Sequence, residues 1–247
     1  MGDIILHGGL GDSLRTQRSV TEMITERIPV TLEIGIMSMI IALLIAIPLG
    51  VYSAIRQDSL GDYIGRSIAI GFIAIPNFWL ATMIMVFPSI WWRWTPALEY
   101  IGFFEDPLTN LGNTVIPAFI LGMAMSGATM RMTRTMMLEV LRQDYIRTAW
   151  AKGLKERAVV VRHALKNGLI PVITIIGLQM PIVIGGTVII EQIFALPGMG
   201  RLMLDAINNR DYTVVSGINL LLASFVLINN LMVDLTYGYL DPRIRYR

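Results

Sequence analysis

Side chains that could carry out catalysis or bind a metal are sparse in this chain of 247 residues. It contains no cysteine, and its two histidines, His7 and His163, lie in distant segments, so we expect no metal site and no histidine-based catalytic centre. The sequence also lacks a G-x-S-x-G nucleophile turn, an H-E-x-x-H zinc helix and paired aspartates within an apolar run. Because it has no G-x-x-x-x-G-K-[ST] phosphate loop, any energy from ATP must come from a separate subunit. These patterns predict a protein that is not an enzyme and binds no cofactor itself.

Acidic residues in or beside long apolar runs are candidates for function, since a charge at the centre of a membrane span costs roughly 2.5–3.5 kcal/mol. Glu33 is expected in the first turn of its span, where the helix dipole would stabilise it in a structural role. Glu191 is expected at the outer end of a later span. Its carboxylate could make a functional contact there or could simply reach water, and the position fits both roles equally well.

Two amides next to prolines are candidates for lining a pathway through the membrane. Asn77 follows Pro76, and Gln179 lies just before Pro181. Proline removes a backbone hydrogen bond and bends a helix, and bent helices with polar side chains near mid-membrane are expected where a polar substrate passes. Hydrogen bonds between packed helices are the alternative role for both amides.

The elements that position these residues follow from composition. Hydrophobic residues make up 54% of the sequence and charged residues 15%, which is too apolar for a soluble domain of this size, and the net charge of +2 gives no support to nucleic-acid binding. Five runs approach the roughly 20 apolar residues that a helix needs to cross a bilayer. They are Val30–Ile55, Ser67–Ile90, Gly112–Met130, Leu169–Ile190 and Val214–Val233. Because they lack the alternation of barrel strands, the predicted fold is all-α, a polytopic helical bundle in the membrane.

The basic residues set the expected orientation of the bundle. Most of the 20 Lys and Arg residues lie in segments that would share one side of the membrane, and the positive-inside rule makes that side cytoplasmic. Residues 1–26 are then expected to be an extracytoplasmic segment, residues 27–240 the transmembrane domain, and residues 241–247 a cytoplasmic tail.

Aromatic residues after the second run agree with this orientation. They are Trp91, Trp92, Trp94 and Tyr100, and they predict an interfacial belt at the outer membrane surface. The residues from Pro96 to Asn110 are expected to form a short outer loop, because Pro96, Gly102 and Pro107 interrupt regular structure.

The segment DYIRTAWAKGLKERAVVVRHALKNG, from Asp144 to Gly168, is basic and amphipathic and lies between two predicted spans. Asp144 is expected to cap a short helix and Gly153 to end it in the left-handed conformation, after which Leu154 folds back on that helix. A second helix is expected at 156–166. The pair could lie flat on anionic lipid headgroups, or the first helix could insert into a groove of a partner, which the rigid glycine break favours.

The same segment resembles the cytoplasmic EAA loop of ABC-importer permeases, in which an E-A-A-x-x-x-G pattern forms the helix that docks on an ATPase subunit. Here the leading positions are Arg147, Thr148 and Ala149, and the glycine is Gly153. The strings DYIRTAWAKGL and RHALKNGLIPV resemble the variant found in dipeptide, oligopeptide and nickel permeases. The same family resemblance extends to GDSLRT, ERIPVTLE, AIPNFWLA, EQIFALPGMGRLMLDAI and the ending LMVDLTYGYLDPRIRYR, which is similar to that of the B-type permease.

The resemblance implies a type I ABC importer transmembrane domain with a cytoplasmic coupling loop at 138–168, in the cytoplasmic (inner) membrane. Its implied partners are a second homologous permease, cytoplasmic ATPase subunits that bind the ATP, an extracytoplasmic substrate-binding protein and membrane lipid. Short peptides are the expected cargo, with nickel complexes, glutathione and oligosaccharides as alternatives in the same family. A passive channel or a structural membrane subunit is the alternative outside it. The family usually has one more span at its start, which this chain is expected to lack.

The resemblance also assigns roles to residues. Those expected to form the ATPase-coupling site are Asp144, Tyr145, Arg147, Thr148, Ala149, Lys152, Gly153 and Leu154. An outer turn formed by Pro197, Gly198 and Gly200 is expected near the mouth of the pathway, beneath the substrate-binding protein, or else as a loop that re-enters the headgroup region.

Overall fold

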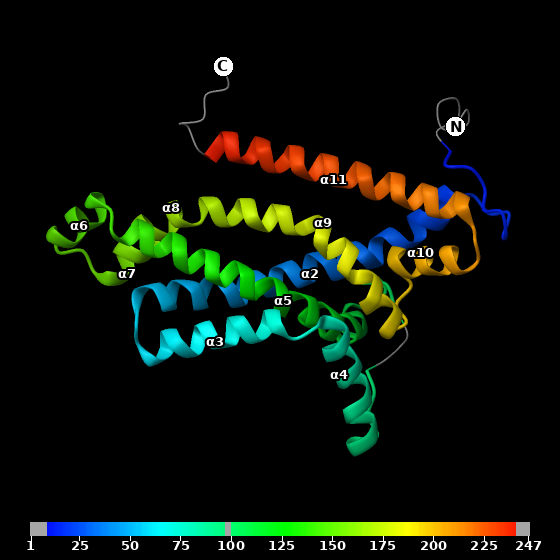
Figure 1. Ribbon diagram of the computed structural model, residues 1–247, viewed down its shortest axis with the longest axis horizontal. Coiled ribbons are helices and arrows are strands. Elements are labelled where there is room, and N and C mark those ends of the chain that lie inside the picture. The colour runs from blue at the N-terminus through cyan, green and yellow to red at the C-terminus, as the bar shows by residue number, and fades with distance from the viewer. Residues whose placement is uncertain (1–8, 97–99, 241–247) are drawn as a thin grey trace. The chain divides into compact units, whose positions relative to one another are not determined.

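The computed structural model describes residues 9–96 and 100–240, which form helices joined by short connections (Figure 1). The predicted tail at 241–247 lies outside these residues. Within them there is no β-strand, and the one isolated bridge pairs Asp12 with Ser19. The helices are α2 (Val20–Ile55), α3 (Leu60–Ala74), α4 (Asn77–Trp92), α5 (Pro107–Leu141), α6 (Asp144–Ala151), α7 (Glu156–Ala158), the π-helix η1 (Val159–Leu165), α8 (Lys166–Gly168), α9 (Ile170–Ile193), α10 (Met199–Asn208) and α11 (Tyr212–Leu240).

The predicted all-α membrane fold is confirmed. Three helices, α2, α5 and α11, are long and apolar enough to cross a membrane alone. Two further pairs of helices, each joined at a bend, bring the number to five when each pair is counted as one span. These pairs are α3 with α4, and the segment Glu156–Gly168 with α9.

Two helices extend well beyond the predicted spans. Helix α2 begins at Val20 rather than Val30, so Glu33 lies in the middle of the helix and the expected position in the first turn is wrong. Helix α5 begins at Pro107, which shortens the predicted outer loop, and continues past Arg131 and Arg134 to Leu141. Helical hydrogen bonding does not stop where hydrophobicity stops, so an apolar run marks only part of such a helix.

The second predicted span is broken rather than kinked. Ile75 ends α3 in an extended conformation, and Pro76 precedes the first residue of α4. Proline has no N–H to continue the ladder and its ring pushes the preceding residue out of the helical region, so both effects act at the same peptide.

The chain forms two compact units, each with its own core. The first unit comprises residues 1–38, 76–121 and 180–229, and the second comprises residues 39–75, 122–179 and 230–247. In the first unit, Ile34, Ile120 and Phe194 lie in one buried cluster, and a second cluster contains Val20, Ile24, Val214 and Ile218. In the second unit one cluster contains Met137, Ile146, Val159 and Ala164, and another contains Ala46, Ala69 and Met130.

Small residues allow close helix packing in the second unit. A Cβ at Gly127 of α5 would lie 2.5 Å from the carbonyl oxygen of Ala69 in α3, and one at Gly50 of α2 would lie 2.9 Å from that of Met130 in α5. Backbones approach this closely only where side chains are absent, which is how helices commonly associate in membranes. Helices α2, α3 and α5 therefore form a tight scaffold for the loops at their ends.

Candidate functional site

Helix α6 forms a short projecting knob whose inner face is anchored in the core of the second unit. Ile146 and Ala149 are buried in the cluster that contains Met137, Val159 and Ala164. The expected cap at Asp144 is wrong, because Gln143 occupies the N-cap position and Asp144 is the first helical residue. Asp144 instead pairs with Arg147 at 3.3 Å. In the first turn its carboxylate is also stabilised by the positive end of the helix dipole.

Gly153 ends the knob as predicted. Its φ of +76° lies in the left-handed region, and its N–H donates to the carbonyl of Trp150 at 2.9 Å. The next residue, Leu154, donates its N–H to the carbonyl of Ala149 at 3.4 Å, which folds the chain back on the helix. This is the glycine stop of a helix C-terminus, and it fixes the direction in which the knob points.

The outer face of the knob is aromatic, basic and open. Tyr145, Trp150 and Leu154 have 42%, 45% and 38% of their surface exposed, and Arg147, Thr148, Lys152 and Gly153 are exposed beside them. Of the eight residues expected at this site, Ala149 alone is buried, so it supports the knob instead of forming its surface. Trp150 was not among the expected contacts, although it is as exposed as Tyr145.

The knob is tied to the rest of the second unit at its base. Arg56, just after α2, pairs with Glu156 of α7 at 3.2 Å, and Asn167 donates an amide N–H to the Tyr145 hydroxyl at 2.9 Å. The predicted second helix is present, but it passes through the π-helix η1 before α8. A π-helical stretch inside an α-helical segment frequently marks a functional site.

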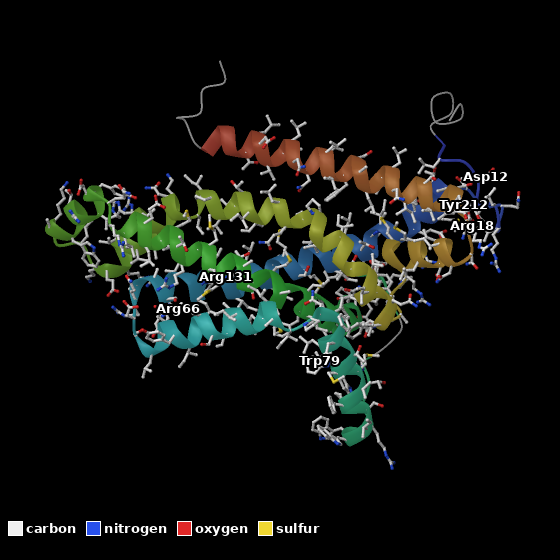
Figure 2. The ribbon with its side chains drawn as sticks, viewed as in Figure 1. Asp12, Arg18, Arg66, Trp79, Arg131 and Tyr212 are labelled. Carbon is white, nitrogen blue, oxygen red and sulfur yellow. The ribbon has the colours of Figure 1, made fainter. Side chains whose placement is uncertain are left out.

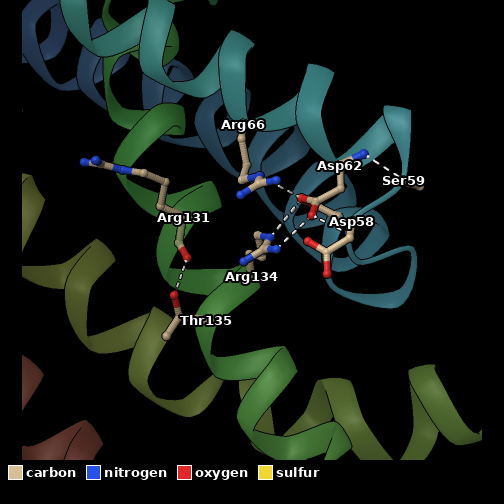
Figure 3. Close-up of polar contacts among 8 residues, drawn as sticks. Asp58, Ser59, Asp62, Arg66, Arg131, Arg134 and Thr135 are labelled. Atoms are coloured by element: carbon tan, nitrogen blue, oxygen red, sulfur yellow. Dashed lines mark hydrogen bonds and ion pairs between the residues drawn. The ribbon is translucent and has the colours of Figure 1, made fainter.

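A buried ion pair lies in the same unit at the corner between α2 and α3 (Figure 3). Asp62 is fully buried and accepts hydrogen bonds from Arg134 Nε at 2.9 Å and Arg134 Nη2 at 2.8 Å, and also from the Ser53 hydroxyl. Its second oxygen accepts the backbone N–H of Asp58 at 3.0 Å. Arg134 follows the predicted span Gly112–Met130, which would put it in a connecting segment on the cytoplasmic side. It instead lies in α5 and joins that helix to the α2–α3 corner.

In the first unit, the outer turn is buried against Glu191. A Cβ at Gly200 would lie 2.5 Å from the Cα of Val188, so only glycine fits there, and a Cβ at Gly198 would displace the Glu191 carboxylate. Pro197 lies between Leu196, which is buried, and this glycine. The turn is therefore tightly packed between α9 and α10.

The Glu191 side chain is fully buried in the first unit. Its Oε1 accepts the Thr31 hydroxyl at 2.7 Å, and its Oε2 accepts the backbone N–H of Arg201 at 3.0 Å. The same Thr31 oxygen accepts the N–H of Met199 at 2.8 Å. Since Gly198 at the N-cap has no side chain, Thr31 and Glu191 satisfy the first turn of α10 from other helices.

The other candidate pathway residues have separate surroundings. Gln179 donates its amide N–H to the Thr129 hydroxyl at 3.3 Å in the second unit, which is the packing role that the sequence left open. Asn77 is the first residue of α4 and is partly exposed. Glu33 accepts a hydrogen bond from the Tyr100 hydroxyl at 2.8 Å, and burial, followed by this bond, raises the pKa of Tyr100.

The N-terminal loop is attached to the joint between α10 and α11. Asp211 is buried there and accepts the Ser13 hydroxyl at 2.5 Å and the Leu14 N–H at 3.3 Å. Burial opposes the charge on Asp211, but these hydrogen bonds and that from the Val214 N–H outweigh it and lower its pKa. Figure 2 shows this end of the first unit, where Asp12 and Arg18 of the loop lie near Tyr212 of α11.

No group of acidic or histidine side chains that could hold a metal occurs among residues 9–96 and 100–240. The aromatic belt at the end of α4 is exposed, with Trp91 and Trp92 at 67% and 70%, and their rings pack edge to face at 5.9 Å. Such rings are typical of the membrane–water interface. The exposed rings at the end of α4 are those of a protein that spans a membrane.

Comparison with known proteins agrees with this description. The model of the family described as "Binding-protein-dependent transport system inner membrane component" matches residues 46–246. The chain is 38% identical over 266 residues to the dipeptide transport system permease protein DppB of Escherichia coli (strain K12), covering 98% of this chain and 78% of the relative. It is 42% identical over 246 residues to the oligopeptide transport system permease protein AppB of Bacillus subtilis (strain 168), with the same coverage of both chains.

Solved structures give the same fold at low sequence identity. An inward-facing structure of the MetNI methionine ABC transporter superposes with a TM-score of 0.69 at 16% identity, covering 90% of this chain and 97% of the other. An amino acid ABC transporter with histidines gives a TM-score of 0.63 at 9% identity, covering 91% and 95%. The predicted type I ABC importer transmembrane fold is thereby confirmed.

Proposed function

This chain belongs to the family of binding-protein-dependent transport system inner membrane components, and from that premise we propose that it forms half of a pathway for short peptides in an ATP-driven importer. It is a multi-pass permease subunit and not itself an enzyme. The peptide cargo is supported by the relatives, which are named as dipeptide and oligopeptide permeases. The second half of the pathway comes from another permease of the same fold, and an extracytoplasmic binding protein delivers the peptide.

The observation that carries the proposal is the exposed knob of α6. Its outer face has aromatic and basic side chains on a rigid helix, while Ile146 and Ala149 fix its inner face in the core. Aromatic and basic residues of this kind dominate protein–protein binding energy when a partner buries them. The knob therefore suits a groove in a cytoplasmic ATPase subunit better than a flat lipid surface.

The mechanism follows from how the knob is attached. Movement of the ATPases against α6 is passed through Glu156 to Arg56 at the end of α2, and through η1 and α8 to α9. Rigid-body displacement of these helices changes access to the central pathway from one side of the membrane to the other. The cytoplasmic side is the one that holds α6 and the C-terminus, in the cytoplasmic (inner) membrane, with residues 1–26 outside. Asn77 remains the candidate for contact with the peptide.

Co-purification with ATPase subunits tests the proposal. Lys152→Glu and Leu154→Asp change exposed residues at the tip of the knob, and each should lower the amount of retained ATPase about tenfold. Arg162→Glu is the matched control, because it makes the same charge reversal at an exposed position of η1. Ala149→Glu is unsuitable, since Ala149 is buried and its change would detach the knob. Failure of the unmodified chain to retain any ATPase would favour a passive channel or a structural subunit.

A further inference from the structure

Arg66 of α3 stands beside a carboxylate that another arginine already satisfies. Both oxygens of Asp62 accept hydrogen bonds from Arg134, and its backbone and hydroxyl donors come from Asp58 and Ser53. Arg66 approaches with its Nε at 3.3 Å from Asp62 Oδ1, within ion-pair distance. Its Nε and Nη2 are nevertheless buried and have no hydrogen-bond partner among the described residues. The guanidinium thus has donors that the cluster does not use.

Other charges nearby do not supply the missing acceptor. In Figure 3 the carboxylate of Asp58 lies toward Arg134, and the side chain of Arg131 points away from Asp62. Arg66 also lies against an aromatic ring, since its guanidinium carbon is 4.6 Å from the ring centre of Tyr63. An aromatic face stabilises a cation but offers no strong hydrogen-bond acceptor. The Arg66 side chain is 35% exposed, so an oxygen-rich anion can approach the guanidinium from its open side.

An apolar stripe continues from Arg66 along the outer face of α3. Tyr63, Ile70 and Ile73 lie three residues before, four after and seven after Arg66, so all share one side of the helix. They are 53%, 57% and 43% exposed, and they border the buried strip of α3 that contains Asp62, Gly65 and Ala69. A single cation at the end of such a stripe matches an amphiphile with an anionic head and a hydrocarbon tail.

We propose that Arg66 and Tyr63 form a binding site for the phosphate headgroup of an anionic phospholipid, with an acyl chain along Ile70 and Ile73. The proposed orientation puts the start of α3 in the cytoplasmic leaflet, where anionic lipids give basic residues favourable partners. Tyrosine at headgroup depth and arginine on its ring are both favourable there. A free phosphate ion would use only the arginine, so the stripe commits the site to a lipid. The inference goes beyond peptide import and rests on that proposal only for the choice of leaflet.

The test compares lipid retention by the full chain and two arginine variants. Each protein is purified into nanodiscs of phosphatidylcholine that contain a minor fraction of phosphatidylglycerol, and bound lipid is measured by native mass spectrometry after release. Arg66→Gln should lower the preference for phosphatidylglycerol about fivefold, the effect of one basic residue near a membrane surface. Arg131→Gln is the matched control, because it removes the same charge from an exposed position of the neighbouring helix α5 and should leave the preference unchanged.

The outcomes separate a site from general charge. An equal loss of phosphatidylglycerol preference in both arginine variants would overturn the proposal in favour of diffuse surface attraction. If inorganic phosphate stabilised the protein as much as phosphatidylglycerol does, the site would belong to a free ion. If Arg66→Gln does not fold, Tyr63→Leu leaves every ion pair intact and should still weaken the preference. Retained preference in Tyr63→Leu would then overturn the proposal. ATPase co-purification from the same samples reports on the proposed function separately.

Discussion

Asp62 in the second unit and Glu191 in the first are both fully buried carboxylates, but different chemical groups surround them. Asp62 receives two hydrogen bonds from one guanidinium and has a second arginine beside it. Glu191 receives its bonds from a hydroxyl and a backbone N–H, and it forms no ion pair in the described part of the chain. One carboxylate is matched by cations and the other by neutral dipoles.

The difference teaches what each carboxylate is for. A buried ion pair holds its two elements in one register, and removal of either partner leaves an uncompensated charge. Neutral donors at a helix N-terminus satisfy a carboxylate together with the first turn of that helix, and the helix dipole adds to them. Asp62 thus joins α3 to α5, whereas Glu191 organises the turn at which α10 begins.

The largest effect is expected from Asp62→Ala. It leaves Arg134 buried without its partner, which should lower the free energy of unfolding by about 3–5 kcal/mol. Thermal or denaturant unfolding in detergent measures the loss. The matched control is Glu156→Ala, whose pair with Arg56 is largely exposed and should contribute no more than about 1 kcal/mol. Equal effects of the two changes would contradict the assignment of Asp62 as a buried ion pair.

A second variant sharpens the same point. Removing Arg134 as well, in Asp62→Ala with Arg134→Met, eliminates the stranded charge. The double variant should therefore be more stable than Asp62→Ala alone, because the cost comes from an unpaired ion and not from lost attraction. A double variant that is less stable than the single one would show that the Ser53 hydroxyl, which accepts from Arg134 Nε at 3.1 Å, is enough to hold the guanidinium.

Gly198→Ala tests how rigidly Glu191 is enclosed. The added Cβ would lie 2.2 Å from the Glu191 carboxyl carbon, and overpacking of this kind costs about 1–3 kcal/mol. Gly185→Ala lies within the preceding helix α9, with nothing within 4 Å of the new Cβ, so it is the control and should be neutral or slightly stabilising. Equal melting temperatures for the Gly198 variant and the unmodified chain would mean that the carboxylate can move aside.

Glu191→Gln separates charge from hydrogen bonding. The amide keeps an oxygen acceptor for Thr31 or for the Arg201 N–H but cannot serve both, so the expected loss is about 0.5–1.5 kcal/mol. Asp62→Asn, the same chemical change opposite two arginines, should cost more. Their unfolding free energies, measured side by side, test the comparison directly. A larger loss at Glu191 would mean that its charge matters more than its two hydrogen bonds.

Local patterns in the sequence predicted what is determined locally. The apolar runs correspond to helical spans because hydrophobicity is a property of each segment, and Gly153 ends α6 because the left-handed position requires glycine. Two helical segments were missed although they carry a helical pattern. In α10, Met199, Leu202 and Ala206 share the buried face, and at the start of α2 Val20 and Ile24 are buried one turn apart.

The contacts of the buried carboxylates could not be predicted in this way. Asp62 and Arg134 are 72 positions apart, and Glu191 and Thr31 are 160 apart. No periodicity in one helix encodes a pairing with another, so Glu191 looked as if it could reach water and Arg134 looked like a loop residue. The burial of Ala149 was missed for the same reason, since only the tertiary packing of α6 decides which of its residues are buried.

Asp211 provides the smallest expected effect and the cleanest test of neutral donors, because it lies outside the predicted spans. Hydrogen bonds from Ser13, Leu14 and Val214 lower its pKa against the opposing effect of burial. A folded-state pKa below the unfolded value means that the stabilisation is complete above the ordinary carboxyl pKa of about 3.9 and is lost as the pH falls through the folded value. The unmodified chain should thus lose more stability on acidification below about pH 4 than Asp211→Asn does. Asp205→Asn, a change at an exposed position of α10, is the control and should follow the unmodified chain. Parallel pH profiles for all three proteins would mean that hydroxyl and amide donors do not hold the charge at Asp211, which would weaken the same argument for Glu191.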